Sequence, residues 1–279
     1  MAAADPAGRR VPRLIASDLD GTFLSPDGTV SEENAAAVLA AQEAGILVLF
    51  ATGRPVRWLK VITDLPGAHP VVVASNGAVL YDLGSHTILD EETIDPDAAL
   101  EAVGRIRAAV PGVSFGFESG VRFGHEEAYL VPDADDRTRY VGVAEDLARA
   151  DGLVKLLAKH PDVPADDLLD RIRDAVVDLL TPTHSTAAKS DRRAVGLVEL
   201  SAYGVSKASM LQRVCRREGI DPAEVAAFGD SPNDVDMLAW AGLPRVVANA
   251  HPLLHSRDFP VVGSNAESGV GRAIRAWLG

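Results

Sequence analysis

The chain contains a single cysteine, Cys215, among its 279 residues. An intramolecular disulfide needs two cysteines, so packing rather than covalent cross-links must stabilise the fold. The residues around Cys215 have a helical pattern and include no histidine that would suggest a catalytic thiol. We therefore interpret Cys215 as a buried structural residue rather than as a nucleophile.

Positive charge and long apolar runs are also scarce. Lys and Arg number 27 against 40 Asp and Glu, which gives a formal net charge of -13. Nucleic acids and anionic membranes usually bind to basic surfaces, so neither is expected as a partner. No stretch approaches the roughly 20 apolar residues of a membrane span, and no apolar signal-peptide core follows the arginines in residues 1–13. The sequence therefore predicts a cytoplasmic protein.

The sequence does contain enough apolar material for a packed core. Hydrophobic residues make up 47% of the chain and charged residues 24%, as in ordinary globular proteins. The length exceeds that of one average domain, so two domains or one large domain are expected. No internal repeat is apparent, and nothing in the sequence predicts the oligomeric state.

The N-terminal part of the chain alternates strand and helix. Short apolar runs at 14–17, 46–51 and 71–74 predict buried parallel strands. Between the first two, a helix is expected from Ser31 to Ala44, because serine is a good N-cap and a glycine follows the last helical residue. This alternation favours a doubly wound, Rossmann-like α/β sheet.

The pattern changes in the middle of the chain and then returns. Shorter, more polar strands there alternate with helical stretches at 98–109 and 165–177, and residues 181–193 have the composition of an exposed loop. The α/β alternation resumes with a helix that begins at Ser206 and a strand at 225–228.

These shifts predict two domains. Residues 1–80 and 200–279 form a core with a doubly wound parallel sheet, and residues 81–199 form an α+β domain inserted into it.

Polar residues follow the predicted strands, which is where ligands bind in an open α/β sheet. The first such segment is DLDGT at 18–22. Because strand side chains alternate, Asp18 and Asp20 can face the same side, so that one attacks phosphorus while the other moves protons. Mg²⁺ prefers oxygen ligands such as these, and Gly21 permits a tight turn beside the ligand. Taken alone, the segment is better explained as a polar turn.

Two further segments offer groups that can bind phosphate. Thr52 and Gly53 follow the strand at 46–51, and a hydroxyl with adjacent backbone N–H groups can hold a phosphate oxygen. Lys207 lies at the start of a predicted helix, where its ammonium can neutralise a phosphoryl group. Alone, the first is a common turn and the second an exposed helix lysine.

The fourth segment, GDSPND at 229–234, ends the strand at 225–228. Asp230 is placed to bind a metal directly, whereas Asn233 and Asp234 can act through water or orient Lys207. Helix capping explains one such acid but not all of these residues. Four strand ends with the right groups in the right order therefore favour a phosphoryl-transfer site, where a metal and a few cations must override the acidic charge of the chain.

In this order the four segments resemble the motifs of the haloacid dehalogenase-like (HAD) phosphatases. The resemblance is to the Cof-type branch, subfamily IIB, in which a large cap follows the third strand, and it covers nearly the whole chain. The segments SNGA at 75–78 and SNAESGV at 264–270 are also similar to segments typical of that branch. The resemblance implies a catalytic core with an α+β cap, and a Mg²⁺-dependent phosphatase that acts on a small phosphorylated molecule through an aspartyl-phosphate.

The resemblance also implies a role for each matching residue. Asp18 would be the nucleophile, and Asp20 would be the general acid and base. The other implied roles are phosphate binding by Thr52, Gly53, Lys207 and Asn233, magnesium binding by Asp18, Asp230 and the backbone carbonyl of Asp20, and support by Gly21 and Asp234.

One segment departs from the family pattern. Asn249 falls where the family often has a Met-Gly-Asn-Ala type loop, and Ala248 stands in place of its glycine. The geometry of that loop is therefore left open, whereas the residues of the core chemistry are all present.

Two other functions remain open. A sugar hydroxyl in place of water would make the chain a phosphosugar mutase or phosphotransferase. A non-hydrolytic, receiver-like module also uses acids, a threonine and a lysine, but such modules are far shorter and lack an acid placed as Asp20 is. The substrate can be a sugar, nucleotide-like or cofactor phosphate, because the selecting residues would lie in the cap.

Overall fold

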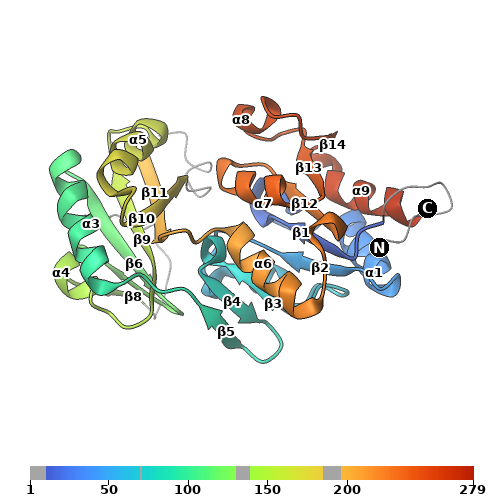
Figure 1. Cartoon of the computed structure of the whole chain (residues 1–279), viewed down its shortest axis with the longest axis horizontal. Coiled ribbons are helices and arrows are strands. Elements are labelled where there is room, and N and C mark those ends of the chain that lie inside the picture. The colour runs from blue at the N-terminus through green and yellow to red at the C-terminus, as the bar shows by residue number, and fades with distance from the viewer. Residues whose placement is uncertain (1–10, 70, 130–138, 185–195) are drawn as a thin grey trace. The chain divides into compact units, whose positions relative to one another are not determined.

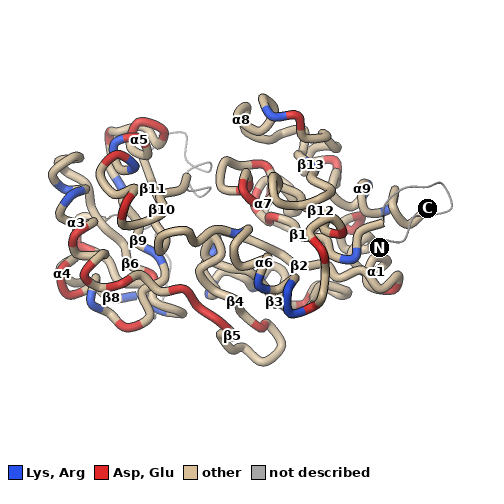
Figure 2. Tube along the Cα trace, in the orientation of Figure 1, with Lys and Arg blue, Asp and Glu red and all other residues tan. Residues whose placement is uncertain are grey.

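The computed structural model describes residues 11–69, 71–129, 139–184 and 196–279. It divides into two compact units, which are described separately. Unit 1 comprises Met1–Arg54, Trp58–Leu89 and Ser206–Gly279, and unit 2 comprises Pro55–Arg57 and Asp90–Val205. Within the described ranges, no helix combines the length and apolar character that crossing a membrane requires. Figure 2 shows acidic segments in both units, in keeping with the negative net charge.

Unit 1 is built on a five-stranded parallel sheet (Figure 1). The strand order is β14 (Val261–Val262), β13 (Leu243–Val247), β12 (Val225–Gly229), β1 (Leu14–Ser17) and β2 (Leu47–Phe50), all in parallel pairs. A second, three-stranded sheet contains β3 (Val71–Ala74), β4 (Val79–Asp82) and β5 (Thr87–Glu91). A parallel bridge between Ala51 and Val73 joins the two sheets.

Helices cover this sheet as the sequence predicts. Helix α1 (Glu32–Glu43) begins after Ser31, whose side-chain oxygen accepts a hydrogen bond from the Asn34 N–H. The other helices of unit 1 are α2 (Lys60–Thr63), α6 (Lys207–Glu218), α7 (Val235–Trp240), α8 (Pro252–His255) and α9 (Gly269–Leu278). Helix α1 packs against α9, and α6 packs against α7. The predicted doubly wound core is confirmed.

Unit 2 is a six-stranded sheet with helices on one face. The strand order is β10 (Leu180–His184), β11 (Gly196–Ala202), β9 (Leu153–His160), β6 (Ser114–Ser119), β7 (Arg122–His125) and β8 (Arg139–Val141). Its pairs are antiparallel except β7 with β8. Helices α3 (Pro96–Ala109), α4 (Ala144–Leu147) and α5 (Ala165–Val176) share one apolar core with the sheet. The predicted α+β insert is therefore confirmed.

One expectation for this unit is wrong in part. Residues 181–193 have a loop-like composition, yet β10 extends to His184 and pairs with β11 along its length. A polar strand at the edge of a sheet needs backbone hydrogen bonds to one neighbour only, so composition gives little sign of it. The rest of that segment, residues 185–193, lies outside the described residues.

Cys215 lies on α6 and is buried, as expected. Burial raises the pKa of its thiol to about 11, so only about one molecule in a thousand carries the reactive thiolate at pH 8. We expect native protein at pH 8 to react with Ellman's reagent far more slowly than protein unfolded in guanidinium chloride. Complete modification of the native protein within minutes would contradict this.

Candidate active site

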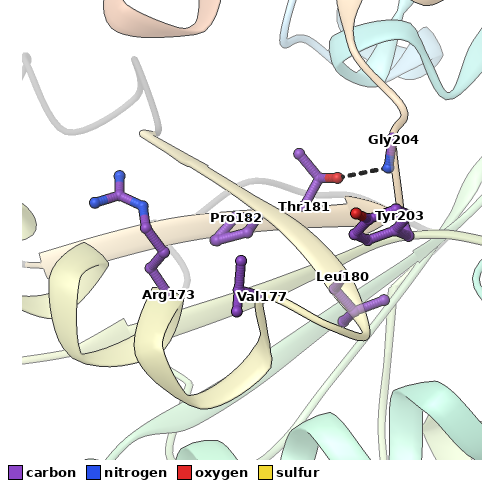
Figure 3. Close-up of a pocket in the computed structure, with 7 residues that line it drawn as sticks. All are labelled: Arg173, Val177, Leu180, Thr181, Pro182, Tyr203 and Gly204. Atoms are coloured by element: carbon purple, nitrogen blue, oxygen red, sulfur yellow. Dashed lines mark hydrogen bonds between the residues drawn. The ribbon is translucent and has the colours of Figure 1, made fainter.

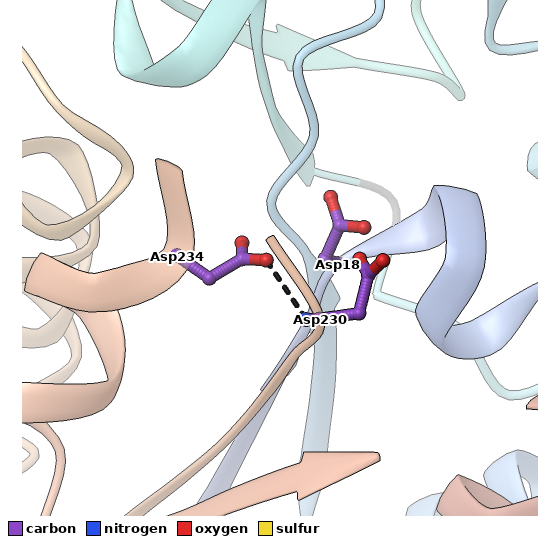
Figure 4. Close-up of side chains that lie close together, drawn as sticks. All are labelled: Asp18, Asp230 and Asp234. Atoms are coloured by element: carbon purple, nitrogen blue, oxygen red, sulfur yellow. Dashed lines mark hydrogen bonds between the residues drawn. The ribbon is translucent and has the colours of Figure 1, made fainter. Parts of the chain in front are cut away.

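Three aspartates from unit 1 come together at the carboxyl ends of neighbouring strands. Strands β1 and β12 pair directly, and Asp18 and Asp230 follow them. Asp234 lies one turn further along, and each of the three side chains is at most 2% exposed. One oxygen from each carboxylate lies within 4.8 Å of the others (Figure 4). The structure thus brings together acids that are more than 200 positions apart in the sequence.

Lys207 binds two of these acids. Its Nζ donates hydrogen bonds to Asp18 Oδ1 at 2.5 Å and to Asp234 Oδ1 at 2.7 Å. The side chain is completely buried, unlike an ordinary lysine at the start of a helix. Burial disfavours the ammonium, but the two carboxylates outweigh it and raise the pKa of Lys207 above its ordinary value. Lys207 is therefore a fixed positive charge beside Asp18.

The pKa of Asp18 is subject to opposing electrostatic influences. Burial raises its pKa well above the usual range for an aspartate, and although Lys207 opposes this, Asp234 and Asp230 reinforce it. Its Oδ2 atom is buried and accepts no hydrogen bond from any described residue. Additional positive charge beside that oxygen would favour the ionised, nucleophilic form.

Asp234 holds the fourth segment in shape. Its Oδ2 accepts hydrogen bonds from the backbone N–H groups of Asp230 at 3.0 Å and Ser231 at 2.9 Å. The Gly229 backbone is so close to the Asp234 side chain that a Cβ atom at Gly229 would lie 2.5 Å from the Asp234 Cβ. Glycine at 229 is therefore needed for the acids to reach their positions.

Asp230 is oriented by hydroxyl groups that sequence reasoning missed. Thr22 Oγ1 donates to Asp230 Oδ1 at 3.1 Å, and Ser231 Oγ donates to Asp230 Oδ2 at 3.2 Å. Gly21 has a φ of +84°, and a Cβ there would lie 2.5 Å from Asp230 Oδ2. Both hydroxyls lie inside the segments that the sequence singles out. Their closeness to the acids in the sequence could have predicted this role.

The loop that departs from the family pattern still reaches the site. Asn249 Nδ2 donates to the backbone carbonyl of Gly21 at 2.7 Å, and Asn249 Oδ1 accepts from the Asn265 N–H at 2.8 Å. Ala248 in place of glycine does not prevent these contacts. Asn249 therefore ties the first segment to the C-terminal segment at 264–270.

Asp20 is not part of the three-acid cluster but pairs with Arg54. The guanidinium donates from Nε to Asp20 Oδ2 and from a terminal nitrogen to Asp20 Oδ1, both at 2.7 Å. The same guanidinium also donates to the carbonyl of Trp58 at 3.1 Å. A bidentate pair fixes the carboxylate more firmly than a single contact does. Arg54 was not among the functional residues that the sequence predicted.

Thr52 and Gly53 lie between the second strand and the turn at 75–77. Thr52 is fully buried, and its Oγ1 accepts a hydrogen bond from the Arg54 N–H at 3.1 Å. The hydroxyl hydrogen is therefore directed elsewhere and can be donated to a phosphate oxygen. Gly53 lies against Asn76, which accepts a hydrogen bond from Asn233 Nδ2 at 3.0 Å.

The acids fit a hard divalent cation. Mg²⁺ binds oxygen ligands, often through one or two carboxylates with several waters retained. Asp18 Oδ2, which has no partner among the described residues, and the neighbouring oxygens of Asp230 form such a donor set. A positive ion would also offset the repulsion between the buried carboxylates.

A groove in unit 2 contains none of these residues. It is lined by Arg173, Val177, Leu180, Thr181, Pro182, Tyr203 and Gly204 (Figure 3). Its lining is mostly apolar and contains no carboxylate, so it offers neither an aspartate nucleophile nor acidic metal ligands.

Replacing Lys207 with methionine should destabilise the protein. The change leaves Asp18 and Asp234 buried without their cation, and breaking a buried ion pair in this way costs about 3–5 kcal/mol. We expect urea unfolding at pH 7.5 to show a loss of that order for Lys207→Met. The control is Lys60→Met at an exposed position, which should change the free energy of unfolding by less than about 0.5 kcal/mol. Equal stability of the two variants would contradict the ion-pair interpretation.

Comparison with known proteins identifies the family. Residues 15–274 match the sequence profile of the haloacid dehalogenase-like hydrolases. Over 267 residues the chain is 28% identical to a phosphoglycolate phosphatase from Methanothermobacter thermautotrophicus. The alignment covers 96% of this chain and 99% of that protein. It is 23% identical over 266 residues to the 5-amino-6-(5-phospho-D-ribitylamino)uracil phosphatase YcsE from Bacillus subtilis, covering 95% and 96%.

A solved structure agrees in fold over the same length. The HAD subclass IIB sugar phosphatase BT4131 matches with a TM-score of 0.74 at 17% identity, covering 95% of this chain and 99% of that one. The family profile covers most of the chain, so membership does not depend on any single motif. The chain belongs to the haloacid dehalogenase-like hydrolases, and the predicted resemblance to their Cof-type phosphatase branch is confirmed.

Proposed function

We propose that this protein is a Mg²⁺-dependent phosphatase that hydrolyses a small phosphorylated metabolite, a sugar phosphate or similar phosphomonoester, through an aspartyl-phosphate on Asp18. The observation that carries the proposal is the environment of Asp18. One of its oxygens accepts a hydrogen bond from Lys207, and the other is buried with no partner among the described residues. A nucleophile needs such an unengaged oxygen beside fixed positive charge.

The residues of unit 1 supply the steps of the reaction. Asp18 attacks phosphorus in line, and the bond to the leaving oxygen breaks as Asp20 protonates that oxygen. Asp20 then takes a proton from water, which attacks the aspartyl-phosphate and releases inorganic phosphate. Lys207 and the Thr52 hydroxyl stabilise the charge on the phosphoryl oxygens.

Magnesium belongs to the same proposal. Asp18, Asp230 and the backbone carbonyl of Asp20 would hold the ion, with Asp234 in support. When bound, Mg²⁺ supplies charge neutralisation between the nucleophile and the phosphoryl group. The unengaged Asp18 oxygen beside Asp230 supports this arrangement.

We further propose that residues 1–80 and 200–279 form the catalytic domain and residues 81–199 a cap that selects the substrate. The compact units of the structure support the division, although they change over at Leu89–Asp90 and Val205–Ser206. The relatives act on different leaving groups, a glycolate in one and a ribitylaminouracil in another, so the proposal names no single metabolite. The formal net charge of -13 supports an enzyme without a nucleic-acid partner, and we propose that it acts in the cytoplasm.

The first test replaces the nucleophile. Asp18→Asn keeps the size of the side chain but removes its charge, so phosphate release from phosphomonoesters should fall by at least about 10³-fold. Chelation of Mg²⁺ should abolish wild-type activity, and added Mg²⁺ should restore it. The matched control is Asp27→Asn at an exposed loop position, which should leave activity unchanged. Full Mg²⁺-dependent activity in Asp18→Asn would overturn the proposal, and an isomerised sugar phosphate in place of free phosphate would favour a mutase.

The second test separates the two aspartates. Asp20→Asn cannot transfer protons, but nitrophenyl phosphate has a leaving group that needs little protonation. This variant should release a burst of about one nitrophenol per active site, followed by turnover slowed by about 10²–10⁴-fold. Arg54→Ala, which releases the Asp20 carboxylate but keeps it in the chain, should show a weaker effect of the same kind. Wild-type turnover in Asp20→Asn would show that Asp20 is not the general acid and base.

A further inference from the structure

The turn at Ser75–Gly77, between β3 and β4, has a strained backbone. Ser75, Asn76 and Gly77 have φ values of +50°, +57° and +102° in succession. The left-handed conformation costs an ordinary residue about 1–2 kcal/mol, and here Ser75 and Asn76 are at most 2% exposed. Strain of this kind persists only where the surrounding structure enforces it, and it is often found at functional sites.

The turn contacts the segment that carries Thr52. The Asn76 N–H donates to the Thr52 carbonyl at 2.9 Å, and the Ser75 N–H donates to the Arg54 carbonyl at 3.0 Å. A Cβ atom at Gly53 would lie 3.0 Å from Asn76 Oδ1. The strained backbone therefore shapes the phosphate-binding loop directly.

The turn also contacts the start of helix α6, where Lys207 lies. A Cβ atom at Gly77 would lie 2.0 Å from the Ser206 carbonyl oxygen and 3.0 Å from the Lys207 nitrogen. No side chain fits at that distance, so glycine allows the turn and the helix to meet. The backbone before Lys207 is thus held by the same three residues.

The third contact is with Asn233, in the fourth segment (229–234), which also carries Asp230 and Asp234. Asn233 Nδ2 donates to Asn76 Oδ1 at 3.0 Å. The other end of that amide, Asn233 Oδ1, is buried and accepts no hydrogen bond from any described residue. A buried acceptor without a donor costs about 1–3 kcal/mol, so this oxygen is suited to a ligand that donates hydrogen bonds or carries positive charge.

We propose that Asn76 is a positioning residue for the metal: it fixes the Asn233 amide so that Asn233 Oδ1 faces the hydrated cation. The proposal rests on the Mg²⁺ site of the proposed function and adds a residue outside its four segments. The contact between Asn76 and the metal-site residue is the hydrogen bond that Asn76 Oδ1 accepts from Asn233 Nδ2. Partners that orient metal-site residues in this way typically change affinity or activity by about 10–100-fold.

The test uses substitutions that separate the effect of losing the Asn76 amide from the effect of backbone strain. Asn76→Gly removes the amide but tolerates the left-handed backbone, whereas Asn76→Ala removes the amide and keeps the strain. Asn76→Asp retains an acceptor for Asn233. The matched control is His86→Gly, because His86 also has a positive φ, +55°, but is exposed in the β4–β5 turn.

Mg²⁺ binding is measured on metal-free protein by calorimetry, and activity is measured against Mg²⁺ concentration. We expect Asn76→Gly to weaken Mg²⁺ binding by about 10–100-fold, with Asn76→Asp closer to wild type and His86→Gly unchanged. Asn76→Ala should unfold at a lower temperature than Asn76→Gly but bind Mg²⁺ equally weakly.

A double-mutant cycle with Asn233→Ala tests the route of the effect. If Asn76 acts through Asn233, Asn76→Gly should weaken Mg²⁺ binding no further in the Asn233→Ala background. Wild-type Mg²⁺ binding by Asn76→Gly, or an equal loss in both backgrounds, would overturn the inference. Failure of the proposed function gives a different result, in which the wild-type protein binds no Mg²⁺ or Asp18→Asn remains active.

Discussion

The buried ammonium of Lys207 between Asp18 and Asp234 is the interaction on which the rest of the site depends. Moving ions out of water costs several kcal/mol each, and only close, well-directed contacts repay it. One cation faces three buried acids, so the cluster keeps an excess of negative charge. Burial raises the pKa of Asp18, and although Lys207 opposes this, Asp234 and Asp230 raise it further. The same imbalance makes the site receptive to a divalent cation. The same charged groups therefore affect both the stability of the site and its capacity to bind a cation.

Those charges can meet only because the backbone approaches closely at three glycines. At Gly21, Gly77 and Gly229 a Cβ atom would lie 2.0–2.5 Å from a neighbouring atom. Gly21 and Gly77 each bring two distant segments together, whereas Gly229 lets its own segment turn back so that Asp234 packs against it. Close packing at glycines therefore shapes the site along with the hydrogen bonds. Tight packing of this kind holds catalytic groups in place without reorganisation during the reaction, which is what electrostatic catalysis requires.

In the proposed mechanism, the segment after strand β2 links proton transfer to phosphate binding. Thr52 and Arg54 lie two positions apart, and Arg54 holds both oxygens of Asp20. The Asn76 N–H also holds this segment with a hydrogen bond to the Thr52 carbonyl. Groups with separate chemical tasks thus share one supporting backbone, and displacement of that backbone would affect all of them.

The sequence by itself determined the alternation of strands and helices, the inserted α+β unit and the residue types at four strand ends, because apolar periodicity and caps are local properties. Tertiary structure decided the pairings. Lys207 lies 189 positions from Asp18, and Arg54 lies 34 positions from Asp20. The polar strand β10 was also missed, because its pairing with β11 depends on backbone hydrogen bonds rather than on side-chain pattern. Contacts between distant segments depend on how the chain packs, and no local pattern in the sequence records that packing.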